Sequence, residues 1–146
     1  MANSCLLAGA GLSAAAALIH VGCIVFGPSW YRFLGAGEQM AQLAAAGHRA
    51  PTLITSGIAA VLAIWATYAL SAAGVIARLP LLRTGLCVIT GIYLLRGLGG
   101  LVLAAAAPGE NGVAFWCWSS LICIGIAAPH LVGTRQVWPV LSRSPA

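Results

Sequence analysis

Four long runs of apolar residues, separated by one long and two short breaks that contain proline and glycine, dominate the sequence. They lie at 5–26, 52–76, 81–107 and 113–133. A helix needs about 20 apolar residues to cross the ~30 Å hydrocarbon core of a bilayer, and each run is long enough. The runs lack the polar–apolar alternation of membrane strands, so helices are the structure that can span. The sequence therefore predicts an all-α fold, a four-helix transmembrane bundle.

The composition excludes an ordinary soluble domain. Only 6% of the 146 residues are charged and mean hydropathy is +0.99, whereas soluble domains carry about 25% charged residues. The length allows one transmembrane domain, 1–146. The net charge of +5 comes from seven scattered arginines, which do not form the basic stripe of a nucleic-acid surface. We expect membrane lipid as a partner, no nucleic acid, and a homo-oligomer or a membrane-protein partner as further possibilities.

The arginines also predict the orientation of the chain. The N-terminus lacks the positive segment of a signal peptide, so we expect it to be kept as the first span. Four spans then place both termini and the second loop on one side, with Arg78, Arg83, Arg135 and Arg143, while the first loop holds Arg32 and Arg49. The positive-inside rule predicts cytoplasmic termini. The Ala-, Gly- and Arg-rich composition is typical of a high-GC bacterial genome, which indicates a multi-pass protein of a bacterial inner membrane.

Two further features of the sequence predict local structure, namely the long first loop and the small residues of the second span. The loop, 27–50, is loosely amphipathic, which predicts a short helix at the membrane interface. Small residues recur every fourth position in the second span, which predicts a close helix contact within the bundle or with a partner. They are Thr55, Ala59, Ala63, Thr67 and Ser71. Aromatic residues near the span ends match an interfacial belt, namely Trp30, Tyr31, Trp116, Trp118 and Trp138.

Arg96 is the residue of the spans that most needs explaining. At the centre of a bilayer an arginine costs about 2.5–3.5 kcal/mol on insertion scales. If the third span is continuous, Arg96 lies near the midplane. If the helix breaks at the glycines of 97–100, Arg96 lies at the outer interface and extends its charge to water. Two partners are open: an ion pair with Glu38, or an anionic group such as a lipid phosphate or a substrate carboxylate.

The candidate ligand-binding residues follow from this question. Arg96 with Glu38, Tyr93, His20 and Arg32 is expected to line a site on the outer side. Tyr93 stands one turn before Arg96 and is expected to share its face. A mildly polar stripe on the fourth span is expected to face the bundle interior, with Ser119, Ser120 and His130 among its members.

No cofactor and no metal are expected. His20 and His130 differ in depth by roughly 16 Å in the predicted spans, so they cannot ligate one haem iron from both sides. Neither histidine has two further ligands at suitable spacing. The five cysteines are odd in number and form no CxxC motif, which favours packing roles.

These residues predict a protein that binds a lipid-like or small anionic ligand within a four-helix bundle. Two alternatives stay open: an accessory or assembly subunit docking through the small residues of the second span, and an intramembrane enzyme acting on a lipophilic substrate. In the enzyme, His20 would be the acid–base and Arg96 the oxyanion stabiliser. The sequence favours an enzymatic role least, because no nucleophile–base spacing is present and no catalytic residue can be named.

The chain resembles small four-span proteins of bacterial inner membranes for which no activity is known. The likeness is one of size, basic charge and span number, and it implies no specific chemistry. Membrane glutathione transferases are similar in size and topology, but their Arg/Asn/Glu grouping in the second span is missing from 52–76. Both acids lie outside the spans, which disfavours proton-coupled export of the small multidrug type.

Overall fold

The computed structural model describes residues 2–141, and within this range the chain is helical with no strand. Four long helices make up most of the chain, and the connections after the second and the third of them are short. The long helices are α1 (Ser4–Phe26), α4 (Arg49–Ala72), α5 (Leu82–Ala106) and α6 (Gly112–Leu141). The first loop folds into two short helices, α2 (Pro28–Phe33) and α3 (Glu38–Ala45), and a 3₁₀ turn, η1 (Gly109–Asn111), precedes α6. Arg143 lies outside the described residues.

Each long helix is long and apolar enough to cross a membrane. Large apolar side chains such as Leu18, Leu53 and Leu95 point outward and are more than two-thirds exposed. Such a surface suits lipid and would be unfavourable in water. The predicted class, an all-α bundle of four apolar spans, is confirmed.

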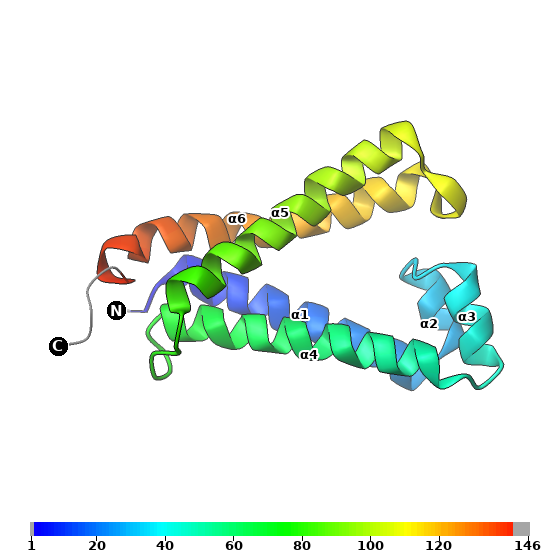
Figure 1. Cartoon of the computed structure of the whole chain (residues 1–146), viewed down its shortest axis with the longest axis horizontal. Coiled ribbons are helices and arrows are strands. Elements are labelled where there is room, and N and C mark those ends of the chain that lie inside the picture. The colour runs from blue at the N-terminus through cyan, green and yellow to red at the C-terminus, as the bar shows by residue number, and fades with distance from the viewer. Residues whose placement is uncertain (1, 142–146) are drawn as a thin grey trace.

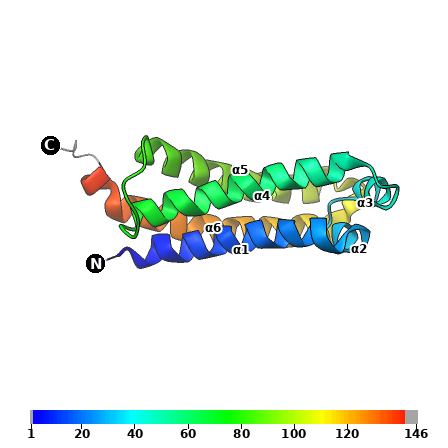
Figure 2. The ribbon, with the colours of Figure 1, turned by 90° about the horizontal axis from the view of Figure 1, so that it is seen from below.

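The long helices associate as two pairs, α1 with α4 and α5 with α6 (Figure 1). The pairs lie close together at the end that holds the N-terminus and the α4–α5 loop, and they diverge toward the end that holds α2 and α3. Viewed at right angles, the four helices run nearly side by side along the length of the molecule (Figure 2). The even number of spans brings Asn3 and Leu141 to the same end of the bundle.

Glycines make the contact between the two pairs close. A Cβ atom added to Gly9 would lie 2.5 Å from Nδ1 of His130, and one added to Gly133 would lie 2.6 Å from Cγ of Leu6. Nearer the α4–α5 loop, a Cβ on Gly85 would lie 2.6 Å from the ring of Tyr68. Small residues allow helices to approach closely in lipid, where dispersion contacts drive association.

The predicted small-residue contact of α4 is only partly present. Thr55, Ala59 and Ser71 are buried, whereas Ala63 and Thr67 are exposed. A row of every fourth residue advances 400° per step, so it drifts by about 40° around the helix and leaves the packed face. The buried stripe continues instead through Leu62, Ala66 and Ala69.

The third span is continuous. α5 runs through Gly97, Gly99 and Gly100 without interruption, so of the two alternatives the continuous span is the one that the structure has. The physical reason is that Gly97 and Gly100 face α6, where an added Cβ would meet Ile124 and Ser120. Arg96 therefore lies fourteen residues after Leu82, about 21 Å along the helix axis.

Candidate functional site

Arg96 points along the α5–α6 pair toward the first half of α6. Its Nη2 lies 3.4 Å from Oγ of Ser119, and its guanidinium carbon lies 5.0 Å from the centroid of the Trp116 ring. Both contacts are with neutral groups, a hydroxyl and an aromatic face. Among the side chains described in residues 2–141, no carboxylate pairs with Arg96.

Glu38 is paired with a different arginine. The Arg32 guanidinium donates two hydrogen bonds to its carboxylate, from Nε at 2.8 Å and from Nη2 at 2.9 Å. The predicted Glu38–Arg96 ion pair is therefore wrong. Arg32 stands only six residues before Glu38, so closing this contact costs little chain entropy compared with a contact across the bundle. The hydrogen bond and charge of Arg32 lower the pKa of Glu38, and Glu38 raises the pKa of Arg32.

A cavity of about 770 Å³ lies between the α2–α3 segment and the first half of α6. The Arg32–Glu38 pair and Ser119 are its charged and hydroxyl groups. The ring of Phe115 packs against Gly35, whose φ of +72° and missing side chain make room for it. The remaining lining is mainly apolar, with Phe33, Leu34, Phe115, Trp118 and Ile122, together with Gly37 and Asn111.

Ser119 connects the cavity with Arg96. It lines the cavity, contacts the guanidinium of Arg96, and donates a hydrogen bond to the Trp116 carbonyl at 3.3 Å. Three residues predicted from sequence thus lie around one cavity, Arg32, Glu38 and Ser119, and Arg96 adjoins it. Phe115, Trp116 and Trp118 were not expected at the site. Phe115 and Trp116 stand four and three residues before Ser119 and so share its face of α6, which was the signal that could have found them.

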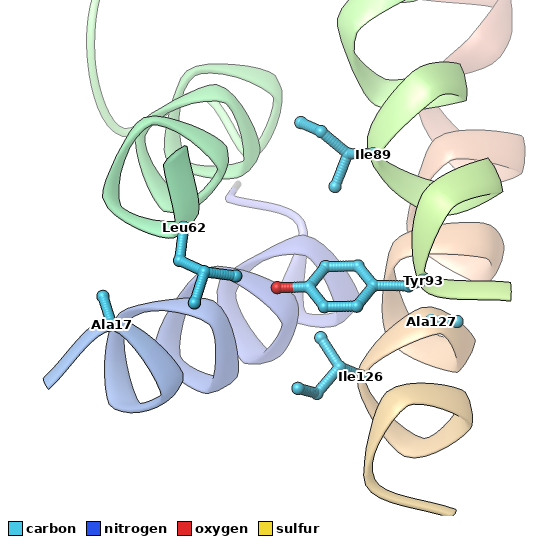
Figure 3. Packing of buried hydrophobic residues seen from close by; sticks show 6 residues of the cluster. All are labelled: Ala17, Leu62, Ile89, Tyr93, Ile126 and Ala127. Carbon is cyan, nitrogen blue, oxygen red and sulfur yellow. The ribbon is translucent and has the colours of Figure 1, made fainter. Parts of the chain in front are cut away.

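Two other predicted residues, Tyr93 and His130, lie in the core of the bundle. The Tyr93 hydroxyl is 3.0 Å from Oγ of Ser13, and its ring contacts those of Trp65 and His130 at centroid distances of 5.0 and 5.6 Å. Figure 3 shows Tyr93 projecting from α5 into the space between the helix pairs, near Leu62. Tyr93 therefore points to α1 while Arg96 points to α6. Ser13, Trp65, Tyr93 and His130 thus form a cluster with one side chain from each of the four long helices.

Of the last two predicted residues, His20 lies on α1, whereas Ser120 lies near Arg96, because a Cβ atom added to Gly100 would meet both Ser120 Oγ and Nη1 of Arg96. His20 contacts the Ala16 carbonyl of its own helix at 2.7 Å through Nδ1. Ser120 is fully buried where α6 meets Gly100 of α5. Within the described part of the chain, no group of three or more His, Cys, Asp or Glu residues is placed to hold a metal ion.

The fold and this site define a class: a multi-pass, all-α integral membrane protein with an arginine in a span beside a partly polar cavity. Comparisons with models of protein families, with curated proteins and with solved structures found no match. The arguments for function therefore depend on the geometry of the site.

Proposed function

We propose that the protein binds a small anionic amphiphile, a lipid-like molecule with one anionic group. The observation that carries the proposal is the Arg96 guanidinium, which lies within a membrane span beside the Ser119 hydroxyl and the Trp116 ring, with no carboxylate paired to it among the described side chains. An anion bound there would offset the cost of about 2.5–3.5 kcal/mol of a central arginine. Guanidinium and carboxylate or phosphate form strong, paired hydrogen bonds.

The surroundings of Arg96 suit such a ligand. The Ser119 hydroxyl is a second hydrogen-bonding group next to the guanidinium. The Glu38 carboxylate is already neutralised by Arg32, so it opposes an incoming anion little. The apolar part of the ligand would pack against Phe115, Trp118 and Ile122, which line the adjoining cavity. Ligand sites commonly combine an apolar lining with few polar groups of this kind.

The test is binding of dodecanoate and of dodecyl phosphate to the purified full chain in neutral detergent, followed by tryptophan fluorescence. Dodecanol is the uncharged control ligand. We expect both anions to bind at least tenfold more tightly than dodecanol, and Arg96→Gln to weaken them about tenfold, which is a loss of about 1.4 kcal/mol. Arg49→Gln is the matched variant, because Arg49 is exposed at the start of α4 and does not line the cavity.

Two results would contradict the proposal. One is equal binding of dodecanol and dodecanoate, which would mean that Arg96 does not select an anion. The other is native mass spectrometry of gently extracted protein that shows a second protein and no bound small molecule. That result would favour the assembly role, for which the exposed Ala63 and Thr67 of α4 would be a docking surface.

We infer further that the membrane is a bacterial inner membrane and that both termini face the cytoplasm. Arg78, Arg83 and Arg135 belong to the end with the termini, whereas Arg32 and Arg49 belong to the opposite end. This excess supports cytoplasmic termini by the positive-inside rule. In this orientation the cavity beside α2 and α3 opens toward the outer side.

A further inference from the structure

A second cavity, separate from the Arg96 site, lies along the α5–α6 pair toward the end with the termini. It is a groove of about 540 Å³. Thr90 and Thr134 are more than nine-tenths buried and form its floor. Leu94 and Leu131 line its deeper part, and the exposed Cys87 and Gly91 line its open side. The groove is therefore an apolar trough that faces lipid.

Two arginines, Arg135 and Arg83, lie beside the end of this groove that Trp138 lines. Arg135 is part of the lining, one helical turn before Trp138, which also lines it. The guanidinium carbon of Arg83 lies 4.1 Å from the centroid of the Trp138 ring. Both acidic residues of the chain, Glu38 and Glu110, belong to segments at the opposite end of the bundle. The groove end thus carries positive charge with no acidic side chain of this protein near it.

The depth of these groups matches a phospholipid. Arg83 is the second residue of α5, about 1.5 Å from its start, whereas Leu94 lies about 18 Å along the axis. Positive charge is therefore at the membrane boundary and the apolar trough extends toward the bilayer centre. Basic pockets between transmembrane helices at the cytoplasmic boundary bind anionic lipid headgroups.

We propose that this groove binds one anionic phospholipid, with an acyl chain in the trough and the phosphate on Arg83 and Arg135. Charge complementarity selects this occupant. A neutral lipid would leave the two arginines without an anion, and a second copy of this end of the chain would bring further arginines to them. The site uses none of the residues of the Arg96 site, and only its cytoplasmic placement rests on the orientation inferred under the proposed function.

Gly91 allows a direct test of the trough. A Cβ added there has no neighbouring atom within 4 Å, so Gly91→Leu adds a side chain to the groove without a clash in the fold. Gly57 on α4 is equally open, and Gly57→Leu is the matched control. The experiment is native mass spectrometry of the full chain in neutral detergent, titrated with phosphatidylglycerol or with phosphatidylcholine.

We expect the wild type to retain one phosphatidylglycerol at least tenfold more tightly than phosphatidylcholine. Gly91→Leu, and Arg83→Gln combined with Arg135→Gln, should each lower this retention about tenfold, whereas Gly57→Leu should not. Equal retention of the two lipids would overturn the proposal, as would retention unchanged by Gly91→Leu. A dimer that becomes monomeric on Gly91→Leu would overturn it too, because the groove would then be an interface between copies.

Discussion

The ion pair between Arg32 and Glu38 should be visible in the titration of the Glu38 carboxyl group. The hydrogen bonds and charge of Arg32 lower the pKa of Glu38. A carboxyl group whose pKa is lower folded than unfolded stabilises the fold above its unfolded pKa, about 4.3, and this contribution is lost as the pH falls through the folded pKa. We therefore expect the ¹³C carboxyl resonance of Glu38 to titrate below pH 4.3, and near 4.3 in Arg32→Gln.

Arg49→Gln is the control for this measurement. It removes one positive charge, as Arg32→Gln does, but it leaves the partner of Glu38 in place. It should leave the Glu38 titration where it is in the wild type. Identical titration curves in the wild type and in Arg32→Gln would show that the pair does not form in the membrane-bound protein.

The sequence identifies Arg96 and Glu38 as charges that need a partner, but it does not identify the partner of either. Arg96 stood out because it is a lone charge in an apolar run, and that signal needs no tertiary structure. The predicted ion pair of Arg96 with Glu38 is wrong because Arg32, only six residues before Glu38 in the chain, pairs with that carboxylate instead. Tyr93 was expected beside Arg96, but residues three apart are separated by about 60° around a helix. That angle sends Tyr93 to Ser13 and Arg96 to Ser119.

At the scale of helices, the α5–α6 contact depends on glycine positions. A Cβ on Gly97 would lie 2.6 Å from Cγ1 of Ile124 and 3.2 Å from the Ser120 carbonyl oxygen, whereas one on Gly99 has no neighbour within 4 Å. We expect Gly97→Leu to lower the free energy of unfolding by about 1–3 kcal/mol, the usual cost of overpacking. Gly99→Leu should change it by less than about 0.5 kcal/mol. Unfolding by sodium dodecyl sulfate in mixed micelles measures both.

Equal destabilisation by the two variants would show that contact of Gly97 with α6 does not decide the effect, because the change from glycine to leucine by itself favours the helix. The same pair of glycines explains why the helix bounds were only partly predictable. Glycines at 97–100 weaken an isolated helix, but contact with α6 retains them in α5. Likewise α6 continues through Pro129 to Leu141, past the end expected near 133, because prolines are tolerated within membrane helices.

At the scale of the whole molecule, apolar length predicted the number of spans, but the arrangement of the spans could not be read from it. Hydropathy reports which segments enter lipid and carries almost no information on which helix faces which. The pairing of α1 with α4 and of α5 with α6, and the divergence of the two pairs, depend on small contacts such as Gly9 with His130. The cavity beside α6 follows from that divergence and from the packing of Phe115 on Gly35.

The orientation of the molecule can be tested by its arginine balance. By sequence, four arginines belong to the end with the termini and two to the opposite end. A green fluorescent protein fused to the C-terminus should therefore fluoresce in a bacterial host, and alkaline phosphatase fused there should be inactive. Arg78→Gln with Arg135→Gln leaves two arginines on each side, and should yield a mixture of both orientations, since the bias in positive charge sets the topology. Arg32→Gln with Arg49→Gln strengthens the bias and should keep a single orientation. Active phosphatase at the C-terminus of the wild type would invert the assignment, and would place the Arg96 cavity toward the cytoplasm.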